Sequence, residues 1–208
     1  MMLLKLNKEG PFKKEVFRAP GHQASMKKLI HFLQQVITLL ILAQILRSVT
    51  LQILTSHVQG RLVNMQNYSL NTIASVMKKF LRKIPGGIFG AENEAAIFNI
   101  IQMEEGPEQM KAVHRLMTSL PTYSQHLLVL LFGTFRVIAS NSVVNETNMT
   151  AQALGVSVAP SFFHTCVAAG SGKVARMEDV ERFKVRRGRW NMRTIPSYFR
   201  RFSLDIYS

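Results

Sequence analysis

The chain has 208 residues, of which 26 are Lys or Arg and 12 are Asp or Glu, so its formal net charge is +14. This length suits one domain with an appendage, and a hydrophobic share of 47% excludes disorder over the whole chain. The single cysteine, Cys166, excludes an intrachain disulfide framework and a zinc site built from several cysteines. The positive charge favours a nucleic acid, an anionic membrane or an acidic or phosphate-bearing protein as partner.

The N-terminal region shows no secretory signal, because charged residues follow the short apolar stretch Met1–Leu6 at once. A cytoplasmic location is therefore expected. Residues 9–21 are rich in Gly, Pro and charge, which predicts a loop. A short helix is predicted to follow from Ser25, whose hydroxyl could cap it.

The stretch Val36–Leu54 consists mostly of Leu, Ile and Val and is long enough to span a bilayer. Arg47 lies within it, and an arginine near the middle of a membrane helix costs about 2.5–3.5 kcal/mol on insertion. We therefore interpret the stretch as a buried or partner-seeking helix, with a membrane span as the alternative.

From Asn71 onwards the pattern is that of amphipathic helices. Apolar residues recur at helical spacing up to Ile84 while basic residues occupy the other face, and Pro85-Gly86-Gly87 ends the helix. No convincing alternating strand and no internal repeat appear, so the predicted fold class is all-α. Further helices are predicted at about 92–104, 107–119, 124–140 and 149–158, the last ending near Pro160.

The tail from Lys184 changes character, since arginines alternate there with Trp190, Tyr198 and Phe199 at irregular spacing. We interpret it as a basic appendage, residues 184–208, outside the core. Together with the apolar stretch 36–54, it could bind an anionic membrane or a nucleic acid.

Several catalytic and metal-binding motifs are absent. Gly172-Lys173 is not a phosphate-binding loop, because Val167 and Val174 occupy the positions where that motif needs Gly and Ser or Thr. The histidines show no metal-ligand spacing, and Cys166 has no base that the sequence reveals. A self-contained hydrolase or metalloenzyme therefore finds no support, and no metal is expected.

Two segments are not explained by helical periodicity. Val16-Phe17-Arg18-Ala19-Pro20-Gly21 places a lone Arg18 in a loop, and Ser75–Pro85 is a basic helix on which Lys78 and Arg82 share one face. From the residues alone, an ordinary surface arginine and a solvated basic helix remain an alternative interpretation.

Together, however, these segments resemble the Rho-type GTPase-activating (RhoGAP) domain. Its signature is Gly-x-Phe-Arg-x-x-Gly in a loop, then Leu-Lys-x-Phe-Leu-Arg-x-Leu-Pro on a helix. A third family block, Asn-x-Met-Thr-x-x-Asn-Leu-Ala and a later Pro, is similar to Asn148–Gly155 followed by Pro160. The sequence Ile84-Pro85-Gly86-Gly87-Ile88-Phe89 resembles that of the subgroup that contains the T-cell-activation Rho GTPase-activating protein.

The resemblance covers roughly residues 9–35 and 59–168 and implies a domain organisation. It implies a RhoGAP-like helical bundle over 9–183, truncated at its first and last helices. Residues 36–58 would be an apolar insertion, and 184–208 would be the basic tail.

The resemblance also implies a mechanism. Such a domain supplies an arginine in trans to a Rho-family small GTPase in its GTP-bound form, in signal transduction, and has no substrate or cofactor of its own. Arg18 aligns with the catalytic arginine finger. Lys78 and Arg82 align with the basic pair that supports the finger loop and binds the GTPase, and Pro160 is expected at the same interface. A nucleic acid is not an expected partner, whereas the tail could contact an anionic membrane.

Some positions depart from the family pattern. Glu15 replaces the usual Gly before the finger, Ser124 replaces a frequent Asn, and Thr147 and Ala153 stand where the family has two Asn residues. Ala153 cannot make the hydrogen bond to the GTPase that the second Asn makes, and one such bond contributes about 0.5–1.5 kcal/mol. The alternative is therefore a degenerate module that binds small GTPases without accelerating hydrolysis.

Overall fold

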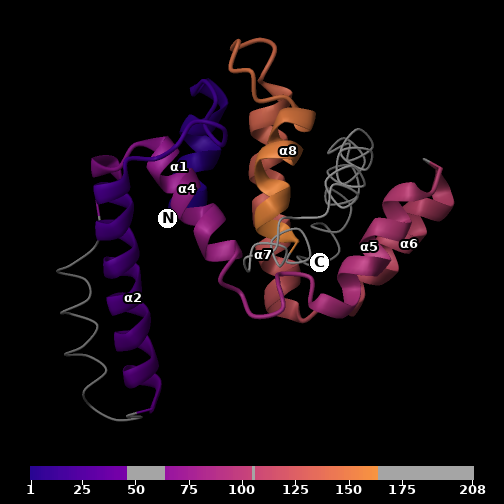
Figure 1. Ribbon diagram of the computed structural model, residues 1–208, viewed down its shortest axis with the longest axis horizontal. Coiled ribbons are helices and arrows are strands. Elements are labelled where there is room, and N and C mark those ends of the chain that lie inside the picture. The colour runs from indigo at the N-terminus through magenta and orange to yellow at the C-terminus, as the bar shows by residue number, and fades with distance from the viewer. Residues whose placement is uncertain (46–63, 105, 164–208) are drawn as a thin grey trace, which may run out of the picture.

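The computed structural model describes residues 1–45, 64–104 and 106–163 (Figure 1). All regular elements of these three segments are helices, which confirms the predicted all-α class. Most of the apolar insertion, the Gly170–Lys173 segment and the basic tail lie outside the described residues.

A short helix, α1 (Met2–Glu9), precedes the predicted loop, and nothing in the sequence pattern predicted it. It packs against α4 and α7, and Leu6 on its inner face is completely buried. Lys5 is also buried, and its ammonium donates to the carbonyl oxygens of Met65 at 2.9 Å and Tyr68 at 3.2 Å. The 3-10 turn η1 (Gly10–Phe12) follows α1 directly.

Helix α2 (Gln23–Ile45) begins before Ser25 and is long, which corrects the predicted short helix capped by that serine. The imidazole Nδ1 of His22 accepts the backbone N–H of Ser25 at 3.3 Å, so a histidine supplies the cap. The helix continues without a break into the first residues of the predicted insertion 36–58. In Figure 1 it extends away from the other helices.

Helix α4 (Leu70–Leu81) follows the 3-10 turn η2 (Met65–Asn67) and has a complete N-terminal cap. The hydroxyl of Ser69 accepts the N–H of Thr72 at 3.2 Å. Gly86 and Gly87 adopt φ angles of 73° and 79°, a left-handed conformation that ends helices and favours glycine. The predicted stop after this helix is confirmed.

Four more helices confirm the predicted elements: α5 (Ala91–Gln102), α6 (Pro107–Ser119), α7 (Thr122–Ser140) and α8 (Ala151–Phe162). The predicted end of α8 near Pro160 is early, because the helix includes this proline. Proline removes one backbone donor, but the N–H of Phe163 still bonds to the Ala159 carbonyl oxygen at 3.1 Å.

The core lies where α1, α4, α7 and α8 meet, and aromatic rings fill much of it. Phe132 and Phe135 of α7 contact Phe162 of α8 with ring centroids 5.8 and 6.2 Å apart. Helices α5 and α6 pack against each other and lie on the other side of α8 from α2 in Figure 1. The segment between η1 and α2 thus lies against this packed core.

Candidate functional site

The segment of residues 13–21, which we call the Arg18 loop, is fixed to the core by apolar side chains. Val16 is completely buried and Phe17 is 1% exposed. The Phe17 ring meets Phe135 of α7 edge to face, with centroids 5.3 Å apart. Burying such a side chain contributes about 1.5–3 kcal/mol. Because its neighbours point inward, the loop holds Arg18 at the surface.

Arg18 has a side chain that is 56% exposed and weakly paired. Its Nη1 donates to Glu15 Oε1 at 3.4 Å, and the Glu15 side chain is itself 42% exposed. Ion pairs in solvent contribute about 0–1 kcal/mol. An incoming anion can therefore replace Glu15 as the partner of the guanidinium at little cost.

Helix α4 holds the second half of the loop through three side chains. Lys78 Nζ donates to the Phe17 carbonyl oxygen at 2.7 Å, Ser75 Oγ accepts the Gly21 N–H at 3.0 Å, and Thr72 Oγ1 accepts the His22 N–H at 3.3 Å. These residues are three positions apart, so they lie on one face of the helix. Each bond ends on a backbone atom, which fixes the path of the chain around Arg18.

Gly21 is required by the close approach of the loop to α4. A Cβ atom at this position would lie 2.7 Å from Thr72 Cα and 3.0 Å from the Asn71 carbonyl oxygen. Both atoms belong to the backbone of a helix and cannot move aside. The glycine therefore allows the contacts of Ser75 and Thr72 to form.

Lys78 and Arg82 place two positive charges on the face of α4 that contacts the loop. Burial of the half-buried Lys78 lowers its pKa below the ordinary 10.5, and the nearby Arg82 lowers it further. Arg82 is exposed at the C-terminal end of the helix. The structure thus brings Lys78 to the backbone of the Arg18 loop and leaves Arg82 in solvent one turn away.

The first half of the loop contacts the segment between α7 and α8. The Glu15 N–H donates to the Thr147 carbonyl oxygen at 2.9 Å. Glu15 has a φ of +52°, which lies in the left-handed region that favours glycine. The structure thus explains why a glycine would suit the position that Glu15 occupies.

Pro160 and Ala153 both lie on α8 (Ala151–Phe162). Ala153 is half-buried in the first turn, and its N–H donates to the capping hydroxyl of Thr150 at 3.2 Å. Pro160 is half-buried about two turns further along. Among the described residues, the hydrogen bonds that the Arg18 loop makes to other elements go to η1, to α4 and to the α7–α8 segment, and none goes to α8.

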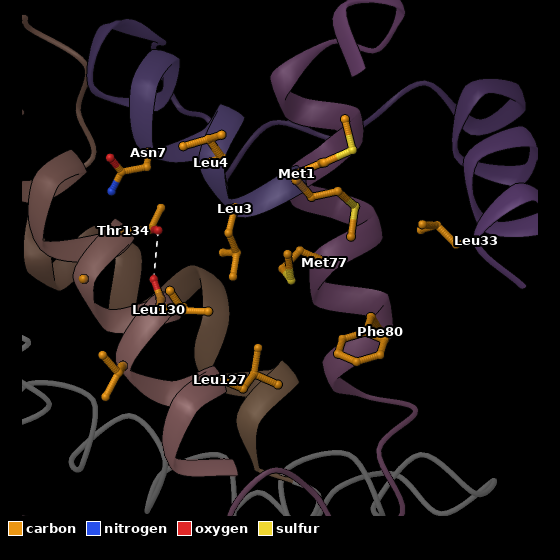
Figure 2. A pocket seen from close by; sticks show the side chains of 13 residues that line it. Met1, Leu3, Leu4, Asn7, Leu33, Met77, Phe80, Leu127, Leu130 and Thr134 are labelled. Atoms are coloured by element: carbon orange, nitrogen blue, oxygen red, sulfur yellow. Dashed lines mark hydrogen bonds between the residues drawn. The ribbon is translucent and has the colours of Figure 1, made fainter. Parts of the chain in front are cut away.

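An apolar groove lies beside the face of α4 that carries Met77 and Phe80 (Figure 2). It has a volume of about 650 Å³ and is lined by α1, α7, Leu33 of α2 and the Met77 and Phe80 side chains of α4. Figure 2 shows the Thr134 hydroxyl on the Leu130 carbonyl oxygen, a bond of 2.9 Å within α7. The groove offers apolar surface and carries none of the predicted site residues.

Neither a metal centre nor a membrane span emerges from the part of the chain that the structure describes. No group of three or more His, Cys, Asp or Glu side chains gathers there. Over the same residues, no helix combines the length and apolar character that crossing a bilayer requires.

Comparison with known proteins identifies one family. The model of the RhoGAP domain matches residues 1–167. Human Rho GTPase-activating protein 20 is 32% identical over 160 residues, which are 77% of this chain and 11% of that protein. Mouse Rho GTPase-activating protein 23 is 28% identical over 126 residues, 59% of this chain and 8% of that protein. The chain thus spans about a tenth of the length of these curated relatives.

Two solved structures share the fold. The BH domain from Graf, the GTPase regulator associated with focal adhesion kinase, superposes with a TM-score of 0.63 at 18% identity, over 96% of this chain and 93% of that one. Human Rho GTPase activating protein 15 gives a TM-score of 0.67 at 16% identity, over 95% and 80%. Similarity to the T-cell-activation subgroup stays a prediction.

Proposed function

Since the chain belongs to the RhoGAP domain family, we propose that it stimulates GTP hydrolysis by a Rho-family small GTPase in signal transduction, with Arg18 as the arginine finger. The observation that carries this proposal is an exposed arginine on a loop whose backbone is bonded to α4 through Lys78. A long, exposed side chain on a fixed backbone suits insertion into the active site of another protein.

The chemistry follows from the charge of the transition state. As the terminal phosphoryl group transfers, negative charge spreads over phosphate oxygens, and a guanidinium that stays protonated can donate several hydrogen bonds to them. An arginine supplied in trans accelerates hydrolysis by about 10³–10⁵ in such systems. At about 1.4 kcal/mol for each factor of ten, this lowers the barrier by roughly 4–7 kcal/mol.

Lys78, Arg82 and Pro160 complete the proposed interface with the GTP-bound partner. Lys78 would act mainly by holding Phe17, whose carbonyl oxygen it bonds at 2.7 Å. Arg82 is exposed and free to meet an acidic surface. Pro160 is half-buried on α8, so only part of its ring could contact the partner.

Single-turnover hydrolysis by GTP-loaded Rho, Rac and Cdc42-type proteins tests the proposal. The full chain should accelerate hydrolysis, and Arg18→Ala should remove at least about 10³-fold of that acceleration. Arg115→Ala is the matched control, because Arg115 is exposed on α6, an element without predicted site residues. No acceleration by the wild-type chain, or equal acceleration by Arg18→Ala, would contradict the catalytic role.

A second candidate function is binding to small GTPases without acceleration. The pairing of Glu15 with Arg18 at 3.4 Å and the methyl side chain of Ala153 favour it. Glu15→Gly removes the competing carboxylate and suits the positive φ of this position. If the wild-type chain binds the GTP-bound form without accelerating hydrolysis while Glu15→Gly accelerates it, the second candidate holds for the natural sequence.

The proposal includes a cytoplasmic location with a membrane contact made by the basic tail, which the charge of residues 184–208 supports. The full chain should sediment with vesicles that contain phosphatidylserine and should do so less after deletion of 184–208. Equal sedimentation of the two chains would remove the tail from the proposal.

A further inference from the structure

The segment that joins α7 to α8, residues 141–150, contacts the chain just before Arg18 at two points. Asn145 Nδ2 donates to the Pro11 carbonyl oxygen at 2.9 Å. The Glu15 N–H donates to the Thr147 carbonyl oxygen, also at 2.9 Å. Because Pro11 and Glu15 lie on either side of Lys13, this segment holds the first half of the Arg18 loop, as α4 holds the second.

The α7–α8 segment is itself well supported. Ser142 is 3% exposed, and Thr147 and Met149 are completely buried. Within the segment, the Thr147 N–H donates to the Ser142 carbonyl oxygen at 3.1 Å, and the Asn145 N–H donates to that of Asn141 at 3.0 Å. It is therefore a firm support from which Asn145 reaches across to η1.

Backbone strain concentrates where the two segments meet. Among the described residues, positive φ angles at non-glycine positions occur at Glu15 (52°), Glu146 (49°) and Asn148 (58°). Each such conformation costs about 1–2 kcal/mol and persists only where surrounding contacts hold it. The bond between Glu15 and Thr147 lies within this strained group, so contacts from both sides must keep Glu15 in place.

The backbone of Glu15 is hydrogen-bonded directly to the backbone of Arg18. The Glu15 carbonyl oxygen accepts the N–H groups of Arg18 and Ala19, both at 2.9 Å. A shift of Glu15 would therefore turn the backbone from which the arginine side chain leaves. The bond from the Asn145 side-chain amide to Pro11 links the α7–α8 segment to the chain before Arg18. It joins residues that are 134 positions apart.

We infer that Asn145 is a positioning residue for the arginine finger, which it holds in register through its bond to Pro11 and the adjacent contact of Thr147 with Glu15. This inference rests on the proposed function of Arg18. It assigns Asn145 an effect on the rate of the chemical step and none on the affinity for the GTPase.

The first test measures single-turnover hydrolysis at increasing concentrations of the full chain. Asn145→Asp keeps the size of the side chain but faces the Pro11 carbonyl oxygen with a carboxylate in place of a donor. The maximal rate should fall about tenfold, because misplacing a catalytic group slows the chemical step, while the half-saturating concentration stays unchanged. The melting temperatures of the variants establish that they are folded.

Asn141→Asp is the matched control. Asn141 lies in the same segment, and its Nδ2 donates to the Val137 carbonyl oxygen at 2.8 Å within the end of α7. The substitution makes the same change of charge without touching the Arg18 loop. The maximal rate of this variant should equal that of the wild-type chain, and equal losses in the two variants would overturn the positioning role.

A double-mutant comparison asks whether Asn145 acts through Arg18. In the Arg18→Ala background the finger is gone, so Asn145→Asp should cause no further loss of rate. A second, independent tenfold loss would overturn the inference.

Hydrogen exchange of the backbone amides of residues 11–19 tests the same contact without any GTPase. These amides should exchange faster in Asn145→Asp and at the wild-type rate in Asn141→Asp. Unchanged exchange in Asn145→Asp would overturn the inference. The wild-type chain could fail to accelerate hydrolysis while exchange is still faster in Asn145→Asp than in the wild-type chain. In that case the proposed function fails, but the contact of Asn145 with the chain before Arg18 stands.

Discussion

Helix α4 contacts two different regions through its two faces. One face carries Thr72, Ser75 and Lys78, which bond to the backbone of the Arg18 loop. The other carries Met77 and Phe80, which line the apolar groove, where Phe80 is 46% exposed. Hydrogen bonds depend steeply on distance and angle, whereas apolar burial is non-directional. The first face therefore fixes the backbone conformation of the Arg18 loop. The second face borders a groove whose apolar surface is not fully covered.

The largest expected effect concerns the apolar anchor of the loop. Phe17→Ala should lower the free energy of unfolding by about 3–5 kcal/mol, because it leaves a cavity against Phe135. Urea unfolding measures this change. Phe12→Ala is the control, since Phe12 is 72% exposed at the end of η1 and should change stability little. Similar losses in both variants would show that the loop is not anchored through Phe17.

Alanine substitutions at two glycines test how much free space there is in the Arg18 loop and beside the groove. Gly21→Ala forces a Cβ to within 2.7 Å of the α4 backbone and should destabilise the chain by about 1–3 kcal/mol. Gly133→Ala, beside the groove, has no atom within 4 Å of the added carbon and should stabilise α7 by about 0.5–1 kcal/mol. Thermal unfolding measures both changes. If both variants were stabilised or both destabilised, the contrast between a tightly packed loop and an open groove would be contradicted.

A smaller effect is expected from the ionisation of Lys78. Its pKa is lower in the folded chain than 10.5, the ordinary value. As the pH rises from the folded value toward 10.5, the unfolded chain binds more protons, so the free energy of unfolding should increase. Lys78→Met should lack this increase. Lys79→Met, at an exposed neighbouring position, controls for loss of a lysine, and equal pH profiles for both variants would contradict the effect of burial.

The smallest effect is expected on the groove side. Leu130 is 52% exposed at the groove, so Leu130→Ser should change the free energy of unfolding by no more than about 0.5 kcal/mol. It should also leave GTP hydrolysis unchanged, because Leu130 lines the groove, and none of the predicted site residues does. A loss above about 2 kcal/mol would mean that this surface is packed and not open.

The helices of this chain are mostly determined by neighbouring residues, which explains how closely the sequence predicts them. The predicted helix 107–119 is found as Pro107–Ser119, because proline at the start and Leu120-Pro121 at the end are local signals. Helix α8 continues past its predicted end near Pro160, because the packing of Phe162 in the core outweighs this local signal. The burial of α1 likewise depends on α4 and α7, which are distant in the sequence.

The sequence by itself predicts Arg18, Lys78 and Arg82 as site residues, because they lie in motifs whose residues are close together in a chain of net charge +14. Apart from Lys78, which the family resemblance already implied, only the tertiary structure decided which groups hold the backbone around Arg18. The hydroxyls of Thr72 and Ser75 and the amide of Asn145 have no motif, and they act on residues 50, 54 and 134 positions away. Such partners meet because whole helices pack against one another, and packing is a property of the assembled core and not of any local pattern.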